Sequence, residues 1–547
     1  MATFAVAVTA SSYVPAYTRA LSREVAMRRW NGWGDEEDRE ELGAELLAFL
    51  REHIGPGRPR EDLSLAQALA AVPPPRLPTS TRFSQDSELR LRHARGQSFA
   101  DYLALRSGDP GPLAEAVALP GTHEETAEAL AEAGRLGAIV IAYGGGTSVA
   151  GQLQVPRGER PVLNISLARM NRLLGIDERA QLARFGAGTP GPQIEAQLRG
   201  YRALLGHFPQ SYRHSTLGGW VMTRASGQQS LRYGSIGQLF EGGRLITPGG
   251  ELSFGGTPAA GSGPDLRELL LGSQGRLGLL TEVSVRIRGL PEHEDFHAVF
   301  FPDWENALEA ARSIAQAELP LSMLRLSNEL ETETRMRRSG HAQSIKWLQR
   351  YLGMRGVGGG QCMMLFGASG SLAGVRRMRR EALALAKRWQ GVHVGKLIGQ
   401  SWRKNRFRSP LLRNALWEQG YAADCVASTV NWPAATGLMR AVERAAREAL
   451  AAMGERVHVC THLSQVGRQG CSLCTSLVWP LQAEREADLA LWQRLRLATA
   501  EATHAHGGSL SHQQAPAPGG DEFGLRLLRA AAAALDPGQM MNPGKLF

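Results

Sequence analysis

A chain of 547 residues and 59.2 kDa is too long for a single hydrophobic core, so its length predicts at least two domains. Its 43% hydrophobic and 21% charged residues are typical of a globular protein, and no apolar run is long enough to cross a membrane. The net charge of +10 comes mostly from arginines spread along the chain and not gathered in one block, so we expect no nucleic-acid partner and favour a small anionic one. Five cysteines are too few for a disulfide framework. We therefore expect a cytoplasmic protein with at most peripheral contact with the inner membrane.

The first 112 residues are expected to contain helices and no catalytic or cofactor-binding residues. Residues 1–26 are interpreted as a disordered extension, or as lying before a true start at Met27. Residues 27–112 form an N-terminal helical segment, in which the spacing of Leu42, Leu46 and Leu50 predicts a helix over residues 36–53. A proline-rich stretch near residue 75 then acts as a linker.

The remainder alternates helices and strands, which predicts an α+β protein. In residues 113–290, a helix begins after Thr122 as N-cap with Glu125 as capping-box partner, and a strand over residues 138–143 runs into three glycines. Residues 291–505 contain longer helices, predicted over 304–319 and 435–454, and form a second α+β domain. Residues 506–547 contain a helix that ends at Asp536-Pro537.

Three glycine-rich segments stand out, at residues 139–153, 214–235 and 271–283. In the first, "IVIAYGGGTSVAGQL", the backbone N–H groups after the strand can converge on an anion because no Cβ is in the way. Thr147 and Ser148 add hydroxyl donors. The pattern is neither GxGxxG nor GxxxxGKS, so it excludes the nucleotide sites that those motifs mark. A pyrophosphate fits the segment, although the segment alone is equally compatible with a tight loop without a ligand.

Together with the closing "NPGKLF", these segments resemble the FAD-binding flavoproteins of the vanillyl-alcohol oxidase type, also called PCMH-type. "RWNGWGD", "STLGGWVMTRASGQQSLRYG", "MLRLSNELET" and "SWRKNRFRSPLLRNALWEQGY" narrow the resemblance to the alkyldihydroxyacetonephosphate synthase family, over nearly the whole chain. The resemblance implies a two-subdomain FAD-binding domain, a substrate-cap domain and a C-terminal segment that returns to the flavin. It also implies non-covalent FAD, since the glycine loop contains no His or Cys.

The same resemblance places the cofactor contacts in the three glycine-rich segments, at the pyrophosphate, at the flavin with its ribityl chain, and at the adenine end. They are Tyr143, Gly144, Gly145, Gly146, Thr147 and Ser148 in the first segment; Ser215, Thr216, Thr223, Arg224, Ala225 and Ser226 in the second; and Gln274, Gly275, Leu277, Gly278 and Leu280 in the third.

On the substrate side, the resemblance places Arg325 and Arg413 at positions that bind an anionic group, which suits the planar guanidinium. Thr429 keeps the hydroxyl of a family serine. Other positions depart from the family. Its reactive tyrosine is replaced by Cys474, and of its C-terminal histidines only His512 is left, as the acid/base candidate. A cysteine could take over proton transfer only if its pKa were lowered.

Several alternatives stay open at this point. The favoured function is an FAD-dependent oxidoreductase or transferase, similar to the synthase, that acts on a small anionic or lipid-linked substrate. The others are an FAD-linked oxidase or dehydrogenase of 2-hydroxy acids, and a flavin-binding protein with a degenerate active site. No metal is expected: a zinc site at Cys460, His462, Cys471 and Cys474 is disfavoured because these residues lie on predicted strands. A homodimer is compatible with the sequence.

Overall fold

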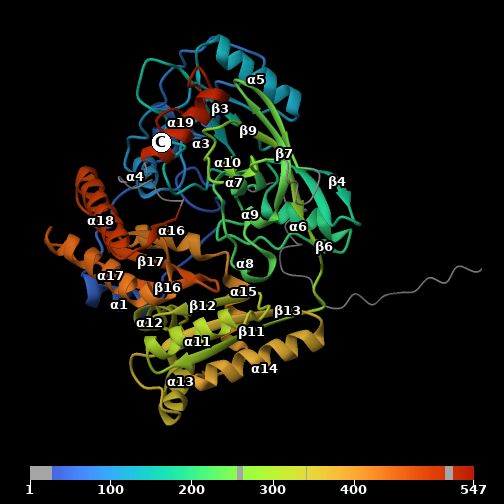
Figure 1. The fold of residues 1–547 in the computed structure, drawn as a ribbon. Helices are drawn as coiled ribbons and strands as arrows, with labels where there is room; N and C mark the ends of the chain where they lie inside the picture. Colours follow the sequence, from blue (N-terminus) through green and yellow to red (C-terminus); the bar gives the residue numbers. More distant parts are fainter. Residues whose placement is uncertain (1–27, 256–262, 341, 512–521, 547) are drawn as a thin grey trace, which may run out of the picture.

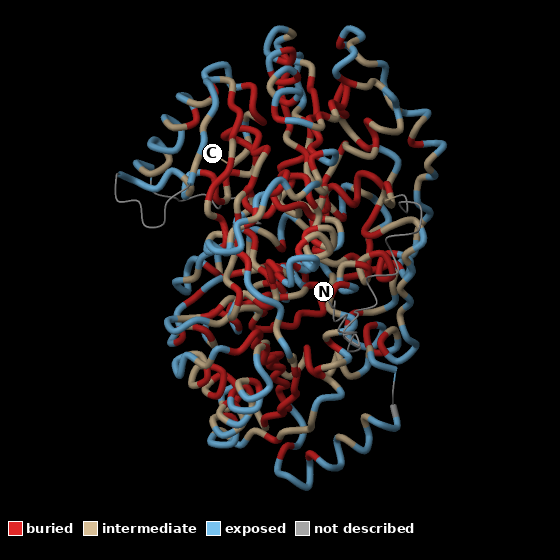
Figure 2. Tube along the Cα trace, turned by 90° about the vertical axis from the view of Figure 1, so that its right-hand side faces the viewer, coloured by how far each residue is buried: buried red, intermediate tan, exposed pale blue. Residues whose placement is uncertain are grey.

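The computed structural model describes residues 28–255, 263–340, 342–511 and 522–546, and it shows two lobes (Figure 1). The upper lobe contains the first ten strands, and the lower lobe contains a large sheet formed by later strands. Buried segments run through both lobes (Figure 2). The predictions for residues 1–26 and for His512 fall outside the described residues.

The N-terminal segment connects the two lobes. Its helices are α1 (Ala44–Ile54), α2 (Leu65–Ala70), α3 (Ser87–Arg92) and α4 (Phe99–Arg106). The helix predicted over residues 36–53 begins only at Ala44, so the prediction was wrong for residues 36–43. There, Asp38 bonds to the Asp35 amide at 2.9 Å and to Arg213 at 3.1 Å, and these contacts hold the chain in a non-helical turn.

The upper lobe contains two sheets with helices packed against them. A parallel sheet has the order β1-β3-β2, with β1 (Ala116–Ala118), β3 (Val162–Ser166) and β2 (Ile139–Tyr143). An antiparallel sheet has the order β4-β5-β9-β7-β8, with β4 (Leu173–Asp177), β5 (Leu182–Gly186), β9 (Leu279–Arg286), β7 (Phe240–Thr247) and β8 (Gly250–Phe254). A short pair joins β6 (Ala203–Leu204) to β10 (Arg288–Gly289). The helices are α5 (His123–Arg135), α6 (Gly191–Arg199), α7 (Leu217–Met222), α8 (Ser230–Tyr233), α9 (Ile236–Leu239) and α10 (Arg267–Leu270).

The lower lobe is built on an eight-stranded sheet with the order β14-β11-β13-β12-β16-β17-β15-β18. Its strands are β11 (His293–Phe301), β12 (Met323–Ser327), β13 (Cys362–Gly370), β14 (Val392–His393), β15 (Tyr421–Asn431), β16 (His458–Val466), β17 (Gly470–Pro480) and β18 (Ser509–Leu510). The helices are α11 (Trp304–Gln316), α12 (Glu329–Arg338), α13 (Ala342–Met354), α14 (Leu372–Arg388), α15 (Leu397–Asn405), α16 (Leu412–Glu418), α17 (Ala435–Ala451) and α18 (Arg485–Ala505), with short 3-10 turns at Ser409–Leu411 and Trp432–Ala434.

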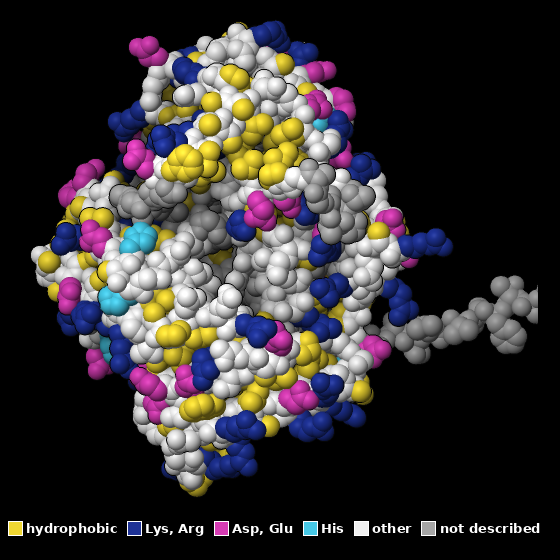
Figure 3. Space-filling model, viewed as in Figure 1, with side chains coloured by type: hydrophobic (Ala, Val, Ile, Leu, Met, Phe, Trp, Pro, Cys, Tyr) yellow, Lys and Arg dark blue, Asp and Glu magenta, His cyan; other side chains and the backbone are white. Residues whose placement is uncertain are grey.

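The two halves of this sheet are covered differently. Around β11 and β13, alternate residues enter one apolar cluster with Trp304 and another with Trp402, so both faces are buried. On β15, β16 and β17, one face packs against α17 and α18 through side chains such as Val426 and Leu477. The opposite face packs against α1 and α16 at its Tyr421 end. Further along, it carries polar and sulfur-containing side chains, and we call this part the open face; Figure 3 shows the molecule hollowed between the lobes.

The C-terminal helix α19 (Glu522–Leu535) returns to the upper lobe, where the Leu535 carbonyl accepts from the Gly249 amide at 2.8 Å. In the described part of the chain, no helix combines the length and apolarity needed to span a bilayer.

Candidate active site

The first glycine-rich segment follows β2 and has the geometry of a backbone cradle. A Cβ on Gly145 would overlap the carbonyl oxygen of His214, and a Cβ on Gly144 would lie 2.5 Å from the Thr216 hydroxyl. Gly146 has φ +61°, a left-handed conformation that favours glycine. These close approaches bring residues 144–146 directly against residues 214–216 of the second segment.

The second segment is a tight turn that leads into α7. Thr216 caps this helix by accepting from the Gly219 amide at 3.3 Å, and Ser215 accepts from Trp220 Nε1 at 2.7 Å. Both hydroxyl residues are buried beside the glycine loop. After α7, Arg224 has φ +49° although it is not glycine, and such strained backbone is concentrated at ligand sites.

The third segment is held against the other two through its backbone. The Gln274 amide donates to the Met222 carbonyl at 2.7 Å, and Gln274 is another non-glycine residue with positive φ, at +54°. A Cβ on Gly275 would lie 3.1 Å from the Ala142 side chain, next to the glycine loop. Leu277 and Leu280 are core residues, so only their backbone could face a ligand. The three segments therefore converge on one place.

The C-terminal tail completes this region. The Val140 amide donates to the Met540 carbonyl at 2.7 Å, and the Asn542 amide donates back to the Val140 carbonyl at 2.9 Å. The buried Asp536 carboxylate binds Arg276 Nη1 at 2.8 Å, which fixes the tail beneath the third segment. The tail thus lies beside the strand from which the glycine loop emerges.

The residues present fit an FAD molecule. Three successive glycines, two of which pack tightly against residues 214–216, lie beside the Thr147 and Ser148 hydroxyls, and a glycine loop of this kind can present backbone N–H groups to a pyrophosphate. Two histidines beside the loop were not predicted from the sequence, because they lie outside the loop and only the fold brings them to it. His93 lies 4.6 Å from the Tyr143 ring, but its two ring nitrogens already contact Leu89 and Ser166. His214 precedes Ser215, and burial lowers its pKa to about 3, so it is neutral.

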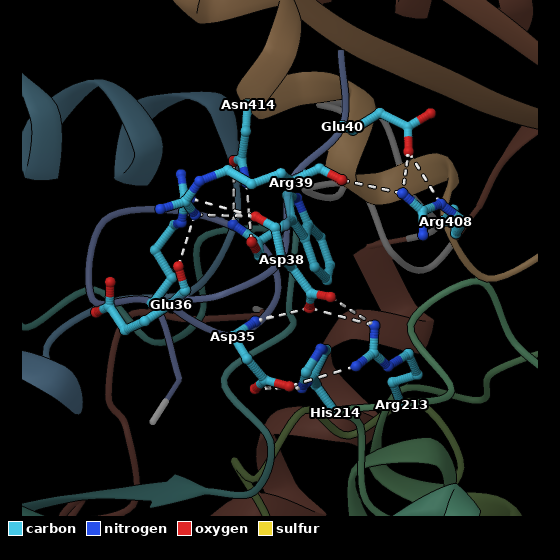
Figure 4. A network of polar contacts seen from close by, with 11 residues as sticks. Asp35, Glu36, Asp38, Arg39, Glu40, Arg213, His214, Arg408 and Asn414 are labelled. Carbon is cyan, nitrogen blue, oxygen red and sulfur yellow. Dashed lines mark hydrogen bonds and ion pairs between the residues drawn. The ribbon is translucent and has the colours of Figure 1, made fainter. Parts of the chain in front are cut away.

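A second feature missed from the sequence is the segment from Arg28 to Glu40, which lies over the glycine loop. Arg28 Nη1 donates to the Gly145 carbonyl, so a guanidinium stands beside the cradle. Figure 4 shows Asp35, Asp38 and His214 close together. Arg213 pairs with both carboxylates, at 3.4 Å and 3.1 Å, so its guanidinium offsets their negative charge. The motif "RWNGWGD" in this segment resembles the family, but the sequence alone does not show that the segment contacts the glycine loop, because that contact is made by the fold.

On the substrate side, Arg325 of β12 belongs to a buried ionic network. It is paired with Glu331, whose second carboxylate oxygen lies 3.2 Å from His462 Nδ1. Burial opposes ionisation of Glu331, but the charges of Arg325 and His462 outweigh it and hold the pKa of the carboxyl below its ordinary value. Among the described residues, no hydrogen-bond partner reaches Arg325 Nε or His462 Nε2, although both atoms are buried.

Arg413 of α16 is the second arginine predicted to bind the substrate, and it too has a buried guanidinium nitrogen without a hydrogen-bond partner among the described residues. Its Nη1 donates to the Gln97 carbonyl at 2.6 Å, and its guanidinium lies 5.0 Å from the centre of the Tyr102 ring. Its Nη2 is buried, and no hydrogen-bond partner for it lies within the described ranges. Both guanidinium groups therefore keep a buried N–H that can donate to a bound acceptor such as an anion.

The remaining predicted residues lie on the open face of the lower sheet. Cys474 of β17 is opposite His462 of β16 and Ala427 of β15, and Thr429 is opposite Ser472 two residues further along. The Ser511 amide donates to the Ala427 carbonyl at 2.8 Å, which brings the described chain before His512 to this face. The pKa of Cys474 is raised by its hydrogen bond with Cys425 and by burial, whereas proton transfer by a cysteine needs a lowered pKa. The proton-transfer role of Cys474 stays a prediction.

The zinc alternative does not fit the sheet. Cys460, His462 and Cys474 lie on the open face, whereas Cys471, opposite Val430, lies in the apolar cluster on the other face. The four side chains therefore do not converge on one point.

Comparisons with known proteins agree with this geometry. Residues 114–254 match the family described as FAD binding domain, and residues 290–546 match the C-terminal domain of FAD linked oxidases. The alkyldihydroxyacetonephosphate synthase of Trypanosoma brucei brucei is 28% identical, over 95% of this chain and 92% of that protein. A solved alkyldihydroxyacetonephosphate synthase has a TM-score of 0.82 at 23% identity, over 95% of this chain and 99% of that one. A p-cresol methylhydroxylase with substrate bound has a TM-score of 0.63 at 12% identity, over 85% of this chain and 93% of that one.

Proposed function

The chain is an FAD-dependent enzyme of the FAD-linked oxidase type, similar to the alkyldihydroxyacetonephosphate synthases, and from this premise we propose that it acts on a lipid-linked dihydroxyacetone phosphate. One observation carries the proposal: Arg325 and Arg413 each have a buried N–H without a hydrogen-bond partner among the described residues, and both lie near the cysteines of the lower sheet, Arg325 near Cys474 and Arg413 near Cys425. Two guanidinium groups are suited to one phosphate, because each offers planar N–H donors.

The chain contributes binding and positioning. Residues 144–148 hold the pyrophosphate through backbone N–H groups and hydroxyls, while Ser215, Thr216 and the turn after α7 line the flavin end. When bound, FAD supplies an electron-accepting ring next to the reacting carbon of the substrate. Arg325 Nε and Arg413 Nη2 bind the phosphate, and the Thr429 hydroxyl is exposed on the same face to bind a polar oxygen.

We further propose that the enzyme works in the cytoplasm and meets its substrate at a membrane surface. The net charge of +10 supports attraction to anionic lipid head groups. A flotation assay with vesicles that contain anionic lipid, compared with neutral vesicles, tests this. Equal recovery with both kinds of vesicle would contradict it.

Anaerobic spectroscopy of the FAD-loaded protein tests the substrate class. We expect alkyldihydroxyacetone phosphate to perturb the flavin spectrum in a saturable way, and D-lactate to leave the oxidised spectrum unchanged. Immediate bleaching by a 2-hydroxy acid would instead establish the dehydrogenase alternative, in which the arginines hold a carboxylate. No response to either compound would indicate a flavin-binding protein without turnover.

The matched variants are Arg325→Met, Arg413→Met and Arg440→Met. The first two remove the proposed phosphate donors and are expected to abolish the response to alkyldihydroxyacetone phosphate. Arg440 forms a surface pair with Glu305, and its side chain is 64% exposed, so its loss is expected to leave the response unchanged.

A further inference from the structure

A cavity of about 370 Å³ lies in the upper lobe among α8, α9, the start of β7 and the short strand β10. Figure 1 shows α8 low in the upper lobe, beside the lower lobe. The cavity is lined by none of the predicted FAD contacts and by neither of the proposed phosphate-binding arginines. Its charged lining residues are Arg232, Arg267, Arg286, Arg288 and Glu241. Four arginines and one carboxylate make the wall of this cavity basic.

Two of the four arginines are neutralised by carboxylates of the protein. Arg267 Nη1 lies 3.2 Å from one carboxylate oxygen of Glu241, and Arg286 Nε pairs with the other. Arg267 also pairs with Asp265 at 2.7 Å. Two carboxylates thus balance the charges of Arg267 and Arg286, so the excess positive charge of the wall comes from the other two arginines.

Arg232 and Arg288 have no acidic partner in the described part of the chain. Arg232 Nη1 donates to the Pro320 carbonyl at 3.4 Å, and the exposed Arg288 makes no side-chain hydrogen bond to a described residue. Two positive charges on the wall of one cavity repel each other, and a concave wall concentrates their field on an anion. An anion in the cavity would remove this repulsion.

The cavity adjoins the parts of the chain that carry both halves of the proposed active site. α8 belongs to the second glycine-rich segment, which lines the flavin end of the cofactor site. Arg288 is on the last strand before β11 of the lower sheet, and Pro320 comes shortly before β12. An anion between Arg232 and Arg288 would therefore connect the two lobes at a place away from the reacting groups.

We propose that this cavity binds a phosphate-bearing ligand through Arg232 and Arg288. The planar guanidinium matches the oxygens of a phosphate, which it can bind through two parallel N–H groups. The volume of the cavity is in the range of small-molecule sites, so the ligand is a diphosphate or a phosphate ester and not a single inorganic ion. This ligand comes either from solution or from the head group of an anionic lipid. The inference goes beyond the proposed function, because neither arginine belongs to the proposed active site.

Calorimetric titration of the FAD-loaded full chain with sodium pyrophosphate in 0.15 M NaCl tests the inference. Bound FAD occupies the glycine loop, and the salt screens diffuse attraction between exposed charges. We expect saturable binding that is at least tenfold weaker in Arg232→Met and in Arg288→Met. Arg157→Met, which removes an exposed arginine of the same lobe outside the cavity, is the control and is expected to bind as the wild type does.

Arg325→Met separates this cavity from the proposed active site. We expect Arg325→Met to keep the binding that depends on Arg232 and Arg288. Absence of saturable binding to the wild type would overturn the inference. Binding that is lost in Arg325→Met and unchanged in Arg232→Met and Arg288→Met would also overturn it, because the pyrophosphate would then lie at the substrate arginines.

Modification of the FAD-loaded wild type with phenylglyoxal, followed by mass spectrometry of the arginine peptides, gives a readout that needs no variant. Pyrophosphate is expected to protect Arg232 and Arg288 and to leave Arg157 reactive. Equal modification of Arg232 and Arg288 with and without pyrophosphate would overturn the inference.

Flotation with vesicles that contain phosphatidate distinguishes the two sources of the ligand. Recovery that falls in Arg288→Met but not in Arg157→Met would support a lipid head group. Equal recovery of these two variants, together with protection of Arg232 and Arg288 by pyrophosphate, would support a soluble ligand.

Discussion

Arg413 Nη1 donates a hydrogen bond of 2.6 Å to the carbonyl oxygen of Gln97, and the backbone amide of Gln97 donates one of 2.6 Å to the carbonyl oxygen of Ser148. Gln97 therefore joins the proposed phosphate-binding arginine to the proposed pyrophosphate loop. Arg413 lies in the lower lobe and Ser148 in the upper one, so this chain of bonds also fixes the distance between the two halves of the site.

Arg413→Lys is expected to weaken substrate binding and, to a smaller extent, FAD binding. A lysine ammonium cannot donate to Gln97 and to a phosphate with the planar geometry of a guanidinium. The loss of a hydrogen bond to a charged group costs about 1.5–3 kcal/mol, or more than tenfold in the dissociation constant of alkyldihydroxyacetone phosphate. Titrations followed by flavin absorbance measure both constants, with Arg440→Lys as control. Unchanged substrate affinity in Arg413→Lys would contradict the assignment.

Gly145→Ala is expected to lower FAD affinity by at least tenfold, or about 1.4 kcal/mol. The added Cβ would overlap the His214 carbonyl, so either the loop or residues 214–216 must move away from the cradle. Gly158→Ala is the matched control in the same lobe, because nothing lies within 4 Å of its added Cβ. Fluorescence titration of the apoprotein with FAD measures the affinity. Equal affinities in the two variants would show that the cradle is not the cofactor site.

Glu331→Gln is expected to destabilise the protein at neutral pH. It leaves Arg325 as a buried charge without its carboxylate partner, which costs about 3–5 kcal/mol. Because the pKa of Glu331 is lower in the folded state than its ordinary 4.5, its stabilisation is present above pH 4.5 and is lost as pH falls further. The difference in melting temperature between wild type and variant should therefore narrow between pH 7 and pH 3.

Glu333→Gln on the same helix is the control for this prediction. Glu333 pairs with Arg337, and both side chains are more than 40% exposed, so little change is expected at either pH. A Glu331→Gln deficit that stays constant from pH 7 to pH 3 would contradict the ionic role of Glu331.

Asp536→Ala is expected to release the C-terminal tail and to weaken FAD binding. Asp536 is fully buried and accepts from Arg276 and from the Met540 and Met541 amides, so its removal takes away the carboxylate that neutralises Arg276. Asp265→Ala, which removes an exposed partner of Arg267, should cost under about 1 kcal/mol. Limited proteolysis at the C-terminus and FAD titration measure the two effects. A protected tail in Asp536→Ala would refute the prediction.

Much of the local structure could be predicted from the sequence, because it depends on neighbouring residues. Thr122 caps α5 by accepting from the Glu125 amide at 3.1 Å, as expected. The Glu125 side chain, however, accepts from the Gly121 amide at 2.6 Å and does not complete the predicted capping box. The helices predicted over 304–319 and 435–454 are found as α11 and α17, each with a shorter C-terminal end.

The long-range parts of the site could not be predicted in this way. Cys425 lies 49 positions before Cys474, and only the pairing of β15 with β17 brings the two together. Glu331 pairs with Arg325 because α12 folds back over the end of β12. Arg28 reaches Gly145 across 117 positions. Such contacts depend on sheet register and on the packing of the lobes, which no local pattern in one sequence specifies.

The most direct test of the account is the visible spectrum of the purified chain before and after acid denaturation. We expect the spectrum of one oxidised FAD per chain and complete release of the FAD into the supernatant, because His93 is engaged and His214 is neutral and buried. Flavin that stays with the denatured chain would contradict the non-covalent site and point to His214. A colourless chain that takes up no added FAD would contradict the cofactor site formed by the three glycine-rich segments.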